Sequence, residues 1–443
     1  MKKYISILSL LCITAFTACE TTVTMDGSAG ARVDAVIDSY YEVLAGAENG
    51  WIADVPTSEG IYRFHMAFTA DNMVTMYTDN LYYEEEYKGI PETSTYNIRS
   101  MQRPTLSFDT YCYLAIINDP DDSISHGSGN QGLETDFEFE VDHLSDDGVF
   151  YLTGRVNRVA ATLRPATAEE LASVKEGRLM DALNNATAYN AGKFNSFSVG
   201  DTKVGYWFTS RVIYFSYYEG DKPVVVSRNT RTQLNYNVEL IEPIEIAGSV
   251  VSGFNWNGSS FSAVVGESEV PVVALDEAVI PLHKMLGPGK NFSILASLLD
   301  MYPSTDASVN QFGYRYSRDN ETLVARFGGL SQVNLEFYNT EAGAPRMSMT
   351  VSFGGYQGAF TYYLEYNTEM DQFKVTKMTF EDDAVGNGQV IYSSFGTRNL
   401  ADFWTGKTFK IELAPKMYSS YLMGQIVLVG GTAPAEFYGA CLE

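Results

Sequence analysis

Apolar and polar residues alternate along most of this 443-residue chain. The segment 62–68 is the clearest case, because Tyr62, Phe64, Met66 and Phe68 occupy every second position. The same pattern returns in four later segments: 137–141, 333–337, 347–353 and 409–413. One-sided strands of this kind are typical of antiparallel sheets with one face in water. The sequence therefore predicts a mostly β protein, built of antiparallel meander sheets or open barrels.

Three segments depart from this alternation and favour helices. Apolar residues recur at helical spacing over 33–47, and Asn49-Gly50 follows as a stop signal. Thr167 and Glu170 form a capping-box pattern ahead of an apolar stripe that continues to residue 183. A third, short helix is expected over 292–299. The predicted fold thus has an N-terminal helix and one or two short helices.

Several polar and aromatic residues have simple structural interpretations. Trp51 is expected to pack the end of the first helix onto the sheet. Asp136 and Glu138 alternate with Phe137 and are expected to face solvent. The acidic segment 118–122 has the hard oxygen ligands that calcium uses, but its spacing favours an Asp-rich turn.

The first nineteen residues have the features of a processing signal. Lys2 and Lys3 precede an apolar run over 5–16, which is shorter than the ~20 residues of a membrane-spanning helix. The run ends at Phe16-Thr17-Ala18-Cys19, a pattern similar to a bacterial lipobox. We therefore expect cleavage before Cys19 and acylation of its thiol, which would anchor the protein to the outer membrane. The pattern does not distinguish a protein on the periplasmic face of that membrane from one on its outer face.

These signals divide the chain into four parts. Residues 1–18 are the expected signal peptide, and residues 19–27 are a polar tether. Proline and glycine residues interrupt the strand pattern between 281 and 289. The prediction is therefore one unit over 28–280, with the helix and a β-rich domain, and a second antiparallel β domain over 290–443.

Composition limits the partners. Fifty-five acidic residues against 30 lysines and arginines give a net charge of −25. Such a surface repels phosphate backbones, so nucleic-acid binding is not expected. With 45% apolar residues the chain can bury a substantial core.

Several segments together resemble a known family. They are 28–33, 47–51, 104–111, 119–120 and 136–139. This set resembles a family of Bacteroidetes outer-membrane lipoproteins built on a domain of unknown function, typically encoded near SusC/SusD-like uptake genes. The resemblance implies an accessory role in nutrient capture, with a SusC/SusD-like transporter complex as a partner. It implies no catalytic residue.

Motifs for catalysis or cofactor binding are missing from the sequence. The four histidines have no paired spacing, and there is no Cys-x-x-Cys or Gly-x-Ser-x-Gly. Cys112 and Cys441 either pair in the oxidising envelope or stay as buried thiols. We expect no enzyme activity, no metal and no cofactor. The alternatives are a hydrolase that acts on glycan or peptide through a carboxylate pair, and a structural or assembly subunit.

Tyrosines are the remaining candidates for a binding site. The chain has 30 of them, and two clusters contain Tyr82 with Tyr83 and Tyr217 with Tyr218. A tyrosine offers a flat apolar face with a polar tip, which suits contact with a glycan or a peptide. These four residues are the predicted ligand-binding residues, with packing between strands as the alternative.

The lipobox generates the first prediction. We expect the mature protein to begin at an acylated Cys19, because the thiol is the only acceptor at the predicted cleavage site. Mass spectrometry of the N-terminal peptide measures this directly, and Cys19→Ala should move the protein from the membrane fraction to the soluble fraction. A mature N-terminus at another residue would contradict the prediction.

Overall fold

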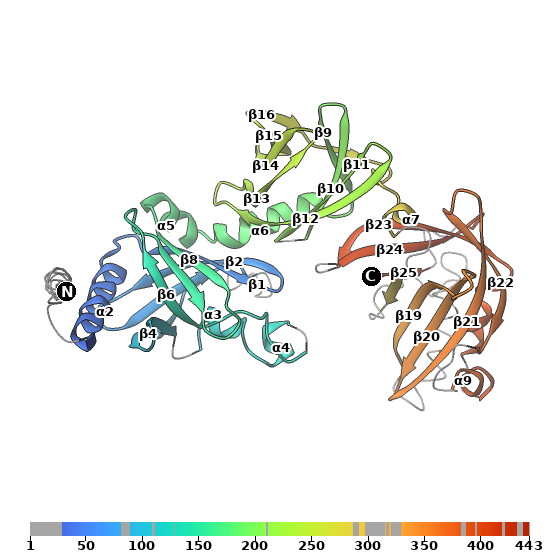
Figure 1. Ribbon diagram of the computed structural model, residues 1–443, viewed down its shortest axis with the longest axis horizontal. Helices are drawn as coiled ribbons and strands as arrows, with labels where there is room; N and C mark the ends of the chain where they lie inside the picture. The colour runs from blue at the N-terminus through green and yellow to red at the C-terminus, as the bar shows by residue number, and fades with distance from the viewer. Residues whose placement is uncertain are drawn as a thin grey trace, which may run out of the picture.

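The chain forms three β units that follow one another in sequence (Figure 1). The computed structural model describes residues 29–80, 89–108, 111–127, 129–209, 211–286, 292–296, 315, 319, 329–381, 387–394, 397–418, 421–431 and 437–442. Two units are closed antiparallel barrels, and between them lies a nine-stranded sheet. The predicted mostly β, antiparallel fold is confirmed, although these two units are closed barrels rather than open ones.

The first barrel closes because β1 pairs with both β2 and β8. Its strands are β1 (Trp51–Thr57), β2 (Gly60–Phe68), β3 (Met73–Thr78), β4 (Glu92–Ser100), β5 (Pro104–Phe108), β6 (Glu138–Leu144), β7 (Phe150–Gly154) and β8 (Ala160–Pro165). Three helices accompany them: α2 (Ala29–Gly46), α3 (Tyr113–Ile116) and α4 (Asp122–Ser125).

The helix α2 packs on the first barrel with the apolar stripe predicted from its sequence. Ile37 and Leu44 join the barrel core. Trp51, at the start of β1, is buried and donates a hydrogen bond from Nε1 to the Leu44 carbonyl oxygen over 2.9 Å. The expectation that Trp51 fixes the helix end on the sheet is confirmed.

The outer side of β2 is buried, whereas the alternating pattern predicts that this side faces water. Tyr62, Phe64, Met66 and Phe68 fill the barrel core as expected. Arg63 and His65 should then face water, but both are also buried. An apolar cluster covers this outer side; it contains Ile52, Ala166, Val174 and Leu179, the last two from helices that follow the barrel.

Asp136 is a second correction of the same kind. It is buried and accepts hydrogen bonds from the backbone N–H groups of Val156 and Asn157, whereas Phe137 is 43% exposed. The strand β6 begins only at Glu138, so Asp136 caps a neighbouring turn instead of belonging to the alternating strand. Glu138 forms ion pairs with Arg99 and Arg155 at the surface, as expected for an outward-facing residue.

Two helices connect the first barrel to the middle sheet: α5 (Ala168–Lys175) and α6 (Arg178–Asn190). The predicted capping box is present, because Thr167 and Glu170 exchange side-chain to backbone hydrogen bonds. The predicted single stripe is divided at Gly177, which adopts a φ of 84°. Glycine takes this left-handed conformation without steric cost, so the chain turns here and starts a second helix.

The middle sheet contains nine strands, the first eight of which form one meander. They are β9 (Phe194–Val199), β10 (Thr202–Thr209), β11 (Val212–Glu219), β12 (Lys222–Thr232), β13 (Val238–Ile246), β14 (Ser249–Trp256), β15 (Phe261–Val265), β16 (Ser268–Pro271) and β17 (Val273–Leu275). The edge strands β16 and β17 are separated by Val272 alone, so one short segment pairs with β15 and then with β9. The sheet is therefore curled almost into a third barrel.

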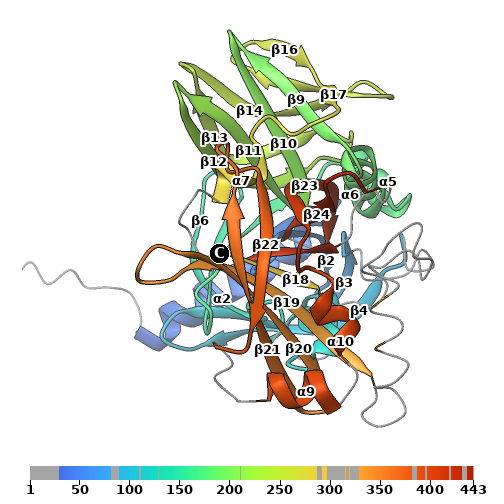
Figure 2. The same ribbon diagram turned by 90° about the vertical axis from the view of Figure 1, so that its right-hand side faces the viewer.

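The C-terminal barrel closes through β18, which pairs with β19 and β25 (β18 is labelled in Figure 2 and β25 in Figure 1). Its strands are β18 (Phe292–Ala296), β19 (Leu330–Asn339), β20 (Pro345–Phe353), β21 (Tyr356–Tyr366), β22 (Gln372–Thr379), β23 (Thr408–Tyr418), β24 (Tyr421–Leu428) and β25 (Phe437–Leu442). Its helices are α7 (Leu282–Leu286), α9 (Gly388–Ser394) and α10 (Arg398–Asp402).

The predicted helix over 292–299 is wrong where the structure describes it. Residues 292–296 form β18, and the Ile294 side chain is fully buried in the barrel core. Two neighbouring strands offer hydrogen bonds to this short apolar segment, and such tertiary pairing overrides a weak local preference for helix.

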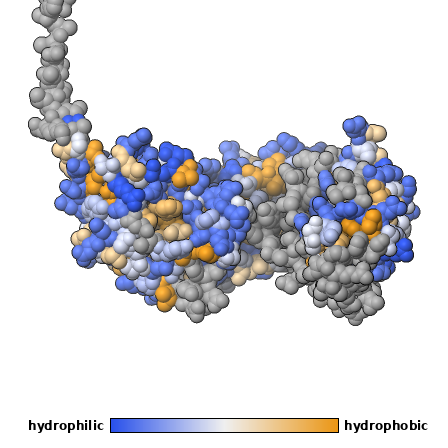
Figure 3. Space-filling model, turned by 90° about the horizontal axis from the view of Figure 1, so that it is seen from below, coloured by the Kyte–Doolittle hydropathy of each residue, from blue (hydrophilic) through white to orange (hydrophobic). Residues whose placement is uncertain are grey.

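The unit boundaries refine the predicted division of the chain. The predicted unit 28–280 contains both the first barrel and the middle sheet, which the alternating pattern alone does not separate. The C-terminal barrel starts at residue 292, close to the predicted start of the second β domain. Over the described residues, no helix is both long and apolar enough to span a membrane. On the face shown in Figure 3 the coloured surface is mainly hydrophilic, and its apolar residues form small separate patches.

Buried ion pairs join the first barrel to the middle sheet. Arg211, between β10 and β11, donates from Nη1 to Asp79 Oδ2 over 2.6 Å and to the Ile61 carbonyl oxygen over 2.8 Å. Its guanidinium carbon lies 3.5 Å from the centroid of the Tyr62 ring. Gly60 permits this approach, because a Cβ there would lie 2.6 Å from Arg211 Cβ.

Asp54 is the second buried carboxylate at this junction. It pairs with Arg63 over 2.8 Å within the barrel and with Arg231 of β12 over 2.5 Å. Burial would raise the pKa of Asp54, but the two guanidinium groups overcome this and hold the pKa below its ordinary value. Carboxylates and arginines therefore neutralise one another across the junction and fix the two units together.

Arg211→Ala should lower the free energy of unfolding by about 3–5 kcal/mol, because Asp79 would be left buried without its main partner. Chemical denaturation measures the change. The control is Arg178→Ala, which removes an exposed pair with Glu176 and should cost less than about 1 kcal/mol. Equal effects of the two substitutions would contradict the assigned role of Arg211.

Asp319 gives the C-terminal barrel a dependence on pH. Burial raises the pKa of this carboxyl to about 6, although Leu400 N–H and the Asn399 side chain donate hydrogen bonds to it. An unfolded aspartate titrates near ~3.9, so the folded state holds the proton more tightly. The stabilising contribution of Asp319 is therefore fully present below about pH 4 and is lost as the pH rises through about 6.

We predict that the stability of the wild type relative to Asp319→Asn falls by about 1–3 kcal/mol between pH 4 and pH 7. Denaturant titrations of both proteins at several pH values measure this difference, and the comparison cancels the titration of other groups. A difference that stays constant or rises with pH would contradict the prediction.

Candidate functional site

The interiors of the three units are filled by their own side chains. Among the described residues, Trp51 and Tyr62 in the first barrel, Phe215 in the middle sheet and Trp404 in the C-terminal barrel are at most 1% exposed. A barrel of eight strands is just wide enough for side chains to fill it. A binding site is therefore expected between the units.

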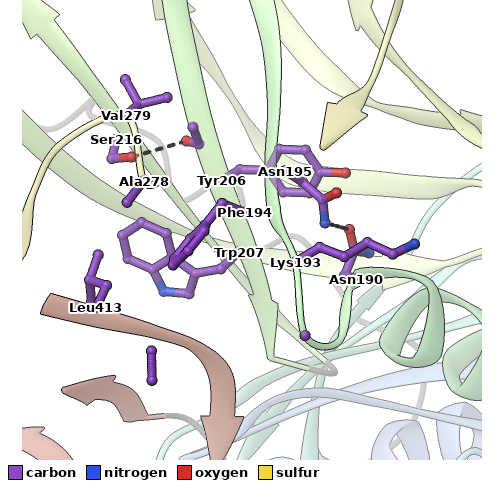
Figure 4. A pocket seen from close by; sticks show the side chains of 13 residues that line it. Asn190, Lys193, Phe194, Asn195, Tyr206, Trp207, Ser216, Ala278, Val279 and Leu413 are labelled. Atoms are coloured by element: carbon purple, nitrogen blue, oxygen red, sulfur yellow. Dashed lines mark hydrogen bonds between the residues drawn. The ribbon is translucent and has the colours of Figure 1, made fainter. Parts of the chain in front are cut away.

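A hollow lies where the outer face of the middle sheet meets the C-terminal barrel (Figure 4). Phe194 and Trp207 line it from β9 and β10, and Leu413 lines it from β23. Ala278 and Val279, in the segment before α7, form another side. The cavity volume is about 30 Å³, and the empty space that includes the open mouth is about 470 Å³.

Gly205 allows the connecting segment to cross the sheet at this point. A Cβ on Gly205 would lie 2.9 Å from Val279 Cγ2 and 2.8 Å from Ser216 Oγ, both closer than real Cβ contacts. Phe194 and Ala278 also pack against the core of the C-terminal barrel. The position of this barrel on the middle sheet is therefore set by small residues and by apolar contacts.

Aromatic rings form the floor of the hollow. Trp207 and Tyr214 are directly opposite each other on β10 and β11. Their ring centroids are 5.6 Å apart and their planes differ by 7°, which is an offset stack. Trp207 is only partly buried, so Tyr214 supports an aromatic surface that faces the hollow and stays partly accessible.

The indole N–H of Trp207 has no hydrogen-bond acceptor among the described residues, although Nε1 itself is buried. A buried donor without a partner costs about 1–3 kcal/mol, so such a group needs an explanation. In Figure 4 the Trp207 ring lies beside Phe194 and turns toward Leu413. Among the described lining, the Trp207 N–H and the Tyr206 hydroxyl are thus the polar groups that are buried without a hydrogen-bond partner.

The other polar groups at the hollow are neutral or already engaged. Asn195 Nδ2 donates to Asn190 Oδ1 over 2.9 Å. Ser216 Oγ makes only a long hydrogen bond of 3.4 Å to the Gly205 carbonyl oxygen. Lys193 is the one charged residue among the described lining, and its Nζ lies 4.4 Å from the Tyr189 ring centroid.

The predicted ligand-binding tyrosines do not meet in one place. Tyr82 and Tyr83 lie outside the described residues, as does Cys19. Tyr217 is 5% exposed and belongs to the core of the middle sheet. Tyr218 faces the other way and is partly buried; Lys284 Nζ lies 5.8 Å from its ring centroid. Tyr217 is therefore a packing residue, which was the alternative.

Two other predicted features take structural roles. In the acidic loop, Asp121 caps α4 through Ser123 N–H, and Asp119 accepts hydrogen bonds from Asp121 N–H and Tyr111 Oη. These bonds are those of an Asp-rich turn. Cys112 is a free, buried thiol whose pKa burial raises to about 11, so it is unreactive.

Trp207, the central residue of the hollow, is not among the binding residues predicted from the sequence. The available signal was the turn at 209–212, which places Trp207 opposite Tyr214 if the two strands form a hairpin. Nothing in the sequence distinguishes this outward pair from Tyr206 and Phe215, which form the neighbouring inward pair.

Comparison with protein families identifies the chain. Residues 23–258, more than half of the chain, match the family described as Domain of unknown function (DUF4302). The chain belongs to this family. The match covers the first barrel and the middle sheet as far as β14, and so includes Phe194, Trp207 and Tyr214 of the hollow. No curated protein matches the sequence.

Solved structures give no useful relative. The DNA polymerase III beta chain of Streptococcus pneumoniae is 10% identical over 92% of this chain and 98% of its own, with a TM-score of 0.13. The beta subunit from DNA polymerase of Streptococcus pyogenes has the same identity and coverage and a TM-score of 0.15. Such scores carry no argument about fold or function.

Proposed function

We propose that this protein is an outer-membrane lipoprotein that captures a small ligand for a nutrient uptake system and has no catalytic activity. The observation that carries the proposal is the hollow between the middle sheet and the C-terminal barrel. It has an aromatic surface supported by Tyr214, and the Trp207 indole N–H there has no hydrogen-bond partner among the described residues. Ligand sites are mostly apolar concave surfaces with a few polar groups, and they favour the junctions between domains.

Membership of a family of unknown function leaves the role open, so the sequence supplies the cellular setting. The lipobox at Cys19 supports anchoring, and the resemblance to Bacteroidetes lipoproteins encoded near SusC/SusD-like genes supports a partnership with such a transporter. A tethered, strongly acidic body stays in solution beside the membrane, where it can meet a ligand before the transporter does.

The described lining favours binding over hydrolysis. No carboxylate is among the described residues that line the hollow, whereas glycoside hydrolysis generally uses two. The buried carboxylates Asp54 and Asp79 lie at the other junction and are held by arginines. We therefore propose capture without turnover.

The test uses the full-length chain with Cys19→Ala, which avoids acylation, and panels of oligosaccharides, peptides and haem. We expect native mass spectrometry to detect a complex with a member of one panel. Trp207→Ala should lower its affinity at least tenfold, because the ring and the N–H are both lost. Trp256→Phe, in the same sheet but outside the lining, is the control and should change the affinity less than twofold.

The opposite results are equally informative. Binding that Trp207→Ala leaves unchanged would contradict the location of the site. Turnover of a bound oligosaccharide or peptide would contradict the absence of catalysis. Failure of every panel to bind would contradict ligand capture.

A further inference from the structure

We propose that the hollow binds one sugar ring of a neutral oligosaccharide, an inference that rests on the proposed capture function. Five properties of the described residues lead to this ligand class: charge, aromatic surface, hydrogen-bonding groups, strand pairing and volume.

Charge favours a neutral ligand. No acidic residue is among the described lining, so a cationic group would find no counter-charge there. Lys193 is the one described cation, and its ammonium group already lies over the Tyr189 ring. Lys193 is exposed to solvent, so a carboxylate or phosphate inside the hollow would lose its hydration without a buried positive partner in return, which is costly.

The aromatic surface favours a flat ligand with apolar C–H groups on one face. Tyr214 backs Trp207 with nearly parallel planes, so the indole is held in one orientation before any ligand arrives. Phe194 is held beside it by contacts with the C-terminal barrel. A rigid aromatic surface loses little conformational entropy on binding. The axial C–H groups of a sugar ring can lie flat on such a surface.

The hydrogen-bonding groups favour hydroxyls on the ligand edge. The Trp207 N–H donates and has no acceptor among the described residues, so it selects an oxygen. Ser216 Oγ is bound only by a 3.4 Å contact and can both donate and accept. A sugar hydroxyl can satisfy either group, whereas a purely hydrocarbon ring would leave the indole N–H buried and unpaired.

Strand pairing argues against an extended peptide. Peptides often bind by adding a strand to a free sheet edge, where their backbone gains hydrogen bonds. The strand β10, which carries Trp207, pairs with β9 on one side and β11 on the other. The sheet therefore offers no free backbone edge at this site.

The volume of the hollow favours one sugar unit of an oligosaccharide over a small molecule that is wholly enclosed. The cavity volume is only about 30 Å³, whereas the empty space that includes the open mouth is about 470 Å³. A single ring can therefore lie in the open part against Trp207, and the neighbouring units of an oligosaccharide can extend into solvent.

The experiment measures the affinity of the full-length Cys19→Ala chain by isothermal titration calorimetry. The neutral probes are cellohexaose, maltohexaose, mannohexaose and xylohexaose; hexagalacturonic acid and a pool of hexapeptides are the comparison probes. We expect one neutral hexasaccharide to bind at least tenfold more tightly than either comparison probe.

Two substitutions separate the contribution of the Trp207 ring from that of its N–H. Trp207→Ala should weaken binding of the neutral hexasaccharide at least tenfold. Trp207→Phe keeps a ring and loses the N–H, so it should weaken binding about threefold to tenfold and also guards against misfolding of the alanine variant. Equal affinity of the wild type and Trp207→Phe would overturn the assigned role of the N–H.

The outcomes separate this inference from the proposed function. If a peptide or the acidic hexasaccharide binds and depends on Trp207, capture at this site stands and the neutral sugar is overturned. If a neutral hexasaccharide binds equally to Trp207→Ala, its site lies elsewhere and this inference is overturned. If none of these probes binds and haem also fails, both proposals fall.

Discussion

Closure of the β units is the constraint on which the rest of the structure depends. In both barrels the first and last strands pair, and in the middle sheet one segment runs along both edges. Each unit thereby satisfies its own backbone hydrogen bonds and buries its own apolar face. Over the described residues the interiors are filled, and the outer faces of neighbouring units form a further surface for binding where they meet.

The two junctions between neighbouring units are built from different kinds of contact. Between the first barrel and the middle sheet, Arg211 and Arg231 reach Asp79 and Asp54, and these opposite charges neutralise one another beside a cavity of only about 10 Å³. Between the middle sheet and the C-terminal barrel the contacts are apolar, and an aromatic surface borders empty space. The first junction is suited to hold two units rigidly, and the second to accept a ligand.

Local patterns predicted the elements but not what covers them. Alternation predicted β2 and spacing predicted α2, because each pattern reports which side faces a core. The burial of Arg63 depends on Thr232, about 170 residues away, whose carbonyl oxygen accepts its hydrogen bond, and no local pattern contains that contact. The same limit applies to Trp207, because inward and outward aromatic pairs have the same spacing. The strand at 292–296 could not be predicted from the sequence, because its pairing with β19 and β25 is what favours a strand over a helix there.

The central claim is that a ligand binds between the middle sheet and the C-terminal barrel and not inside a unit, and fluorine NMR tests it most directly. The chain has four tryptophans, so 5-fluorotryptophan labelling gives four resonances, and Trp207→Phe assigns the one at the hollow. We predict that the neutral hexasaccharide pool shifts the Trp207 resonance and leaves those of Trp51 and Trp404, in the two barrel cores, unchanged. A shift of Trp51 or Trp404 with an unchanged Trp207 resonance would contradict the account.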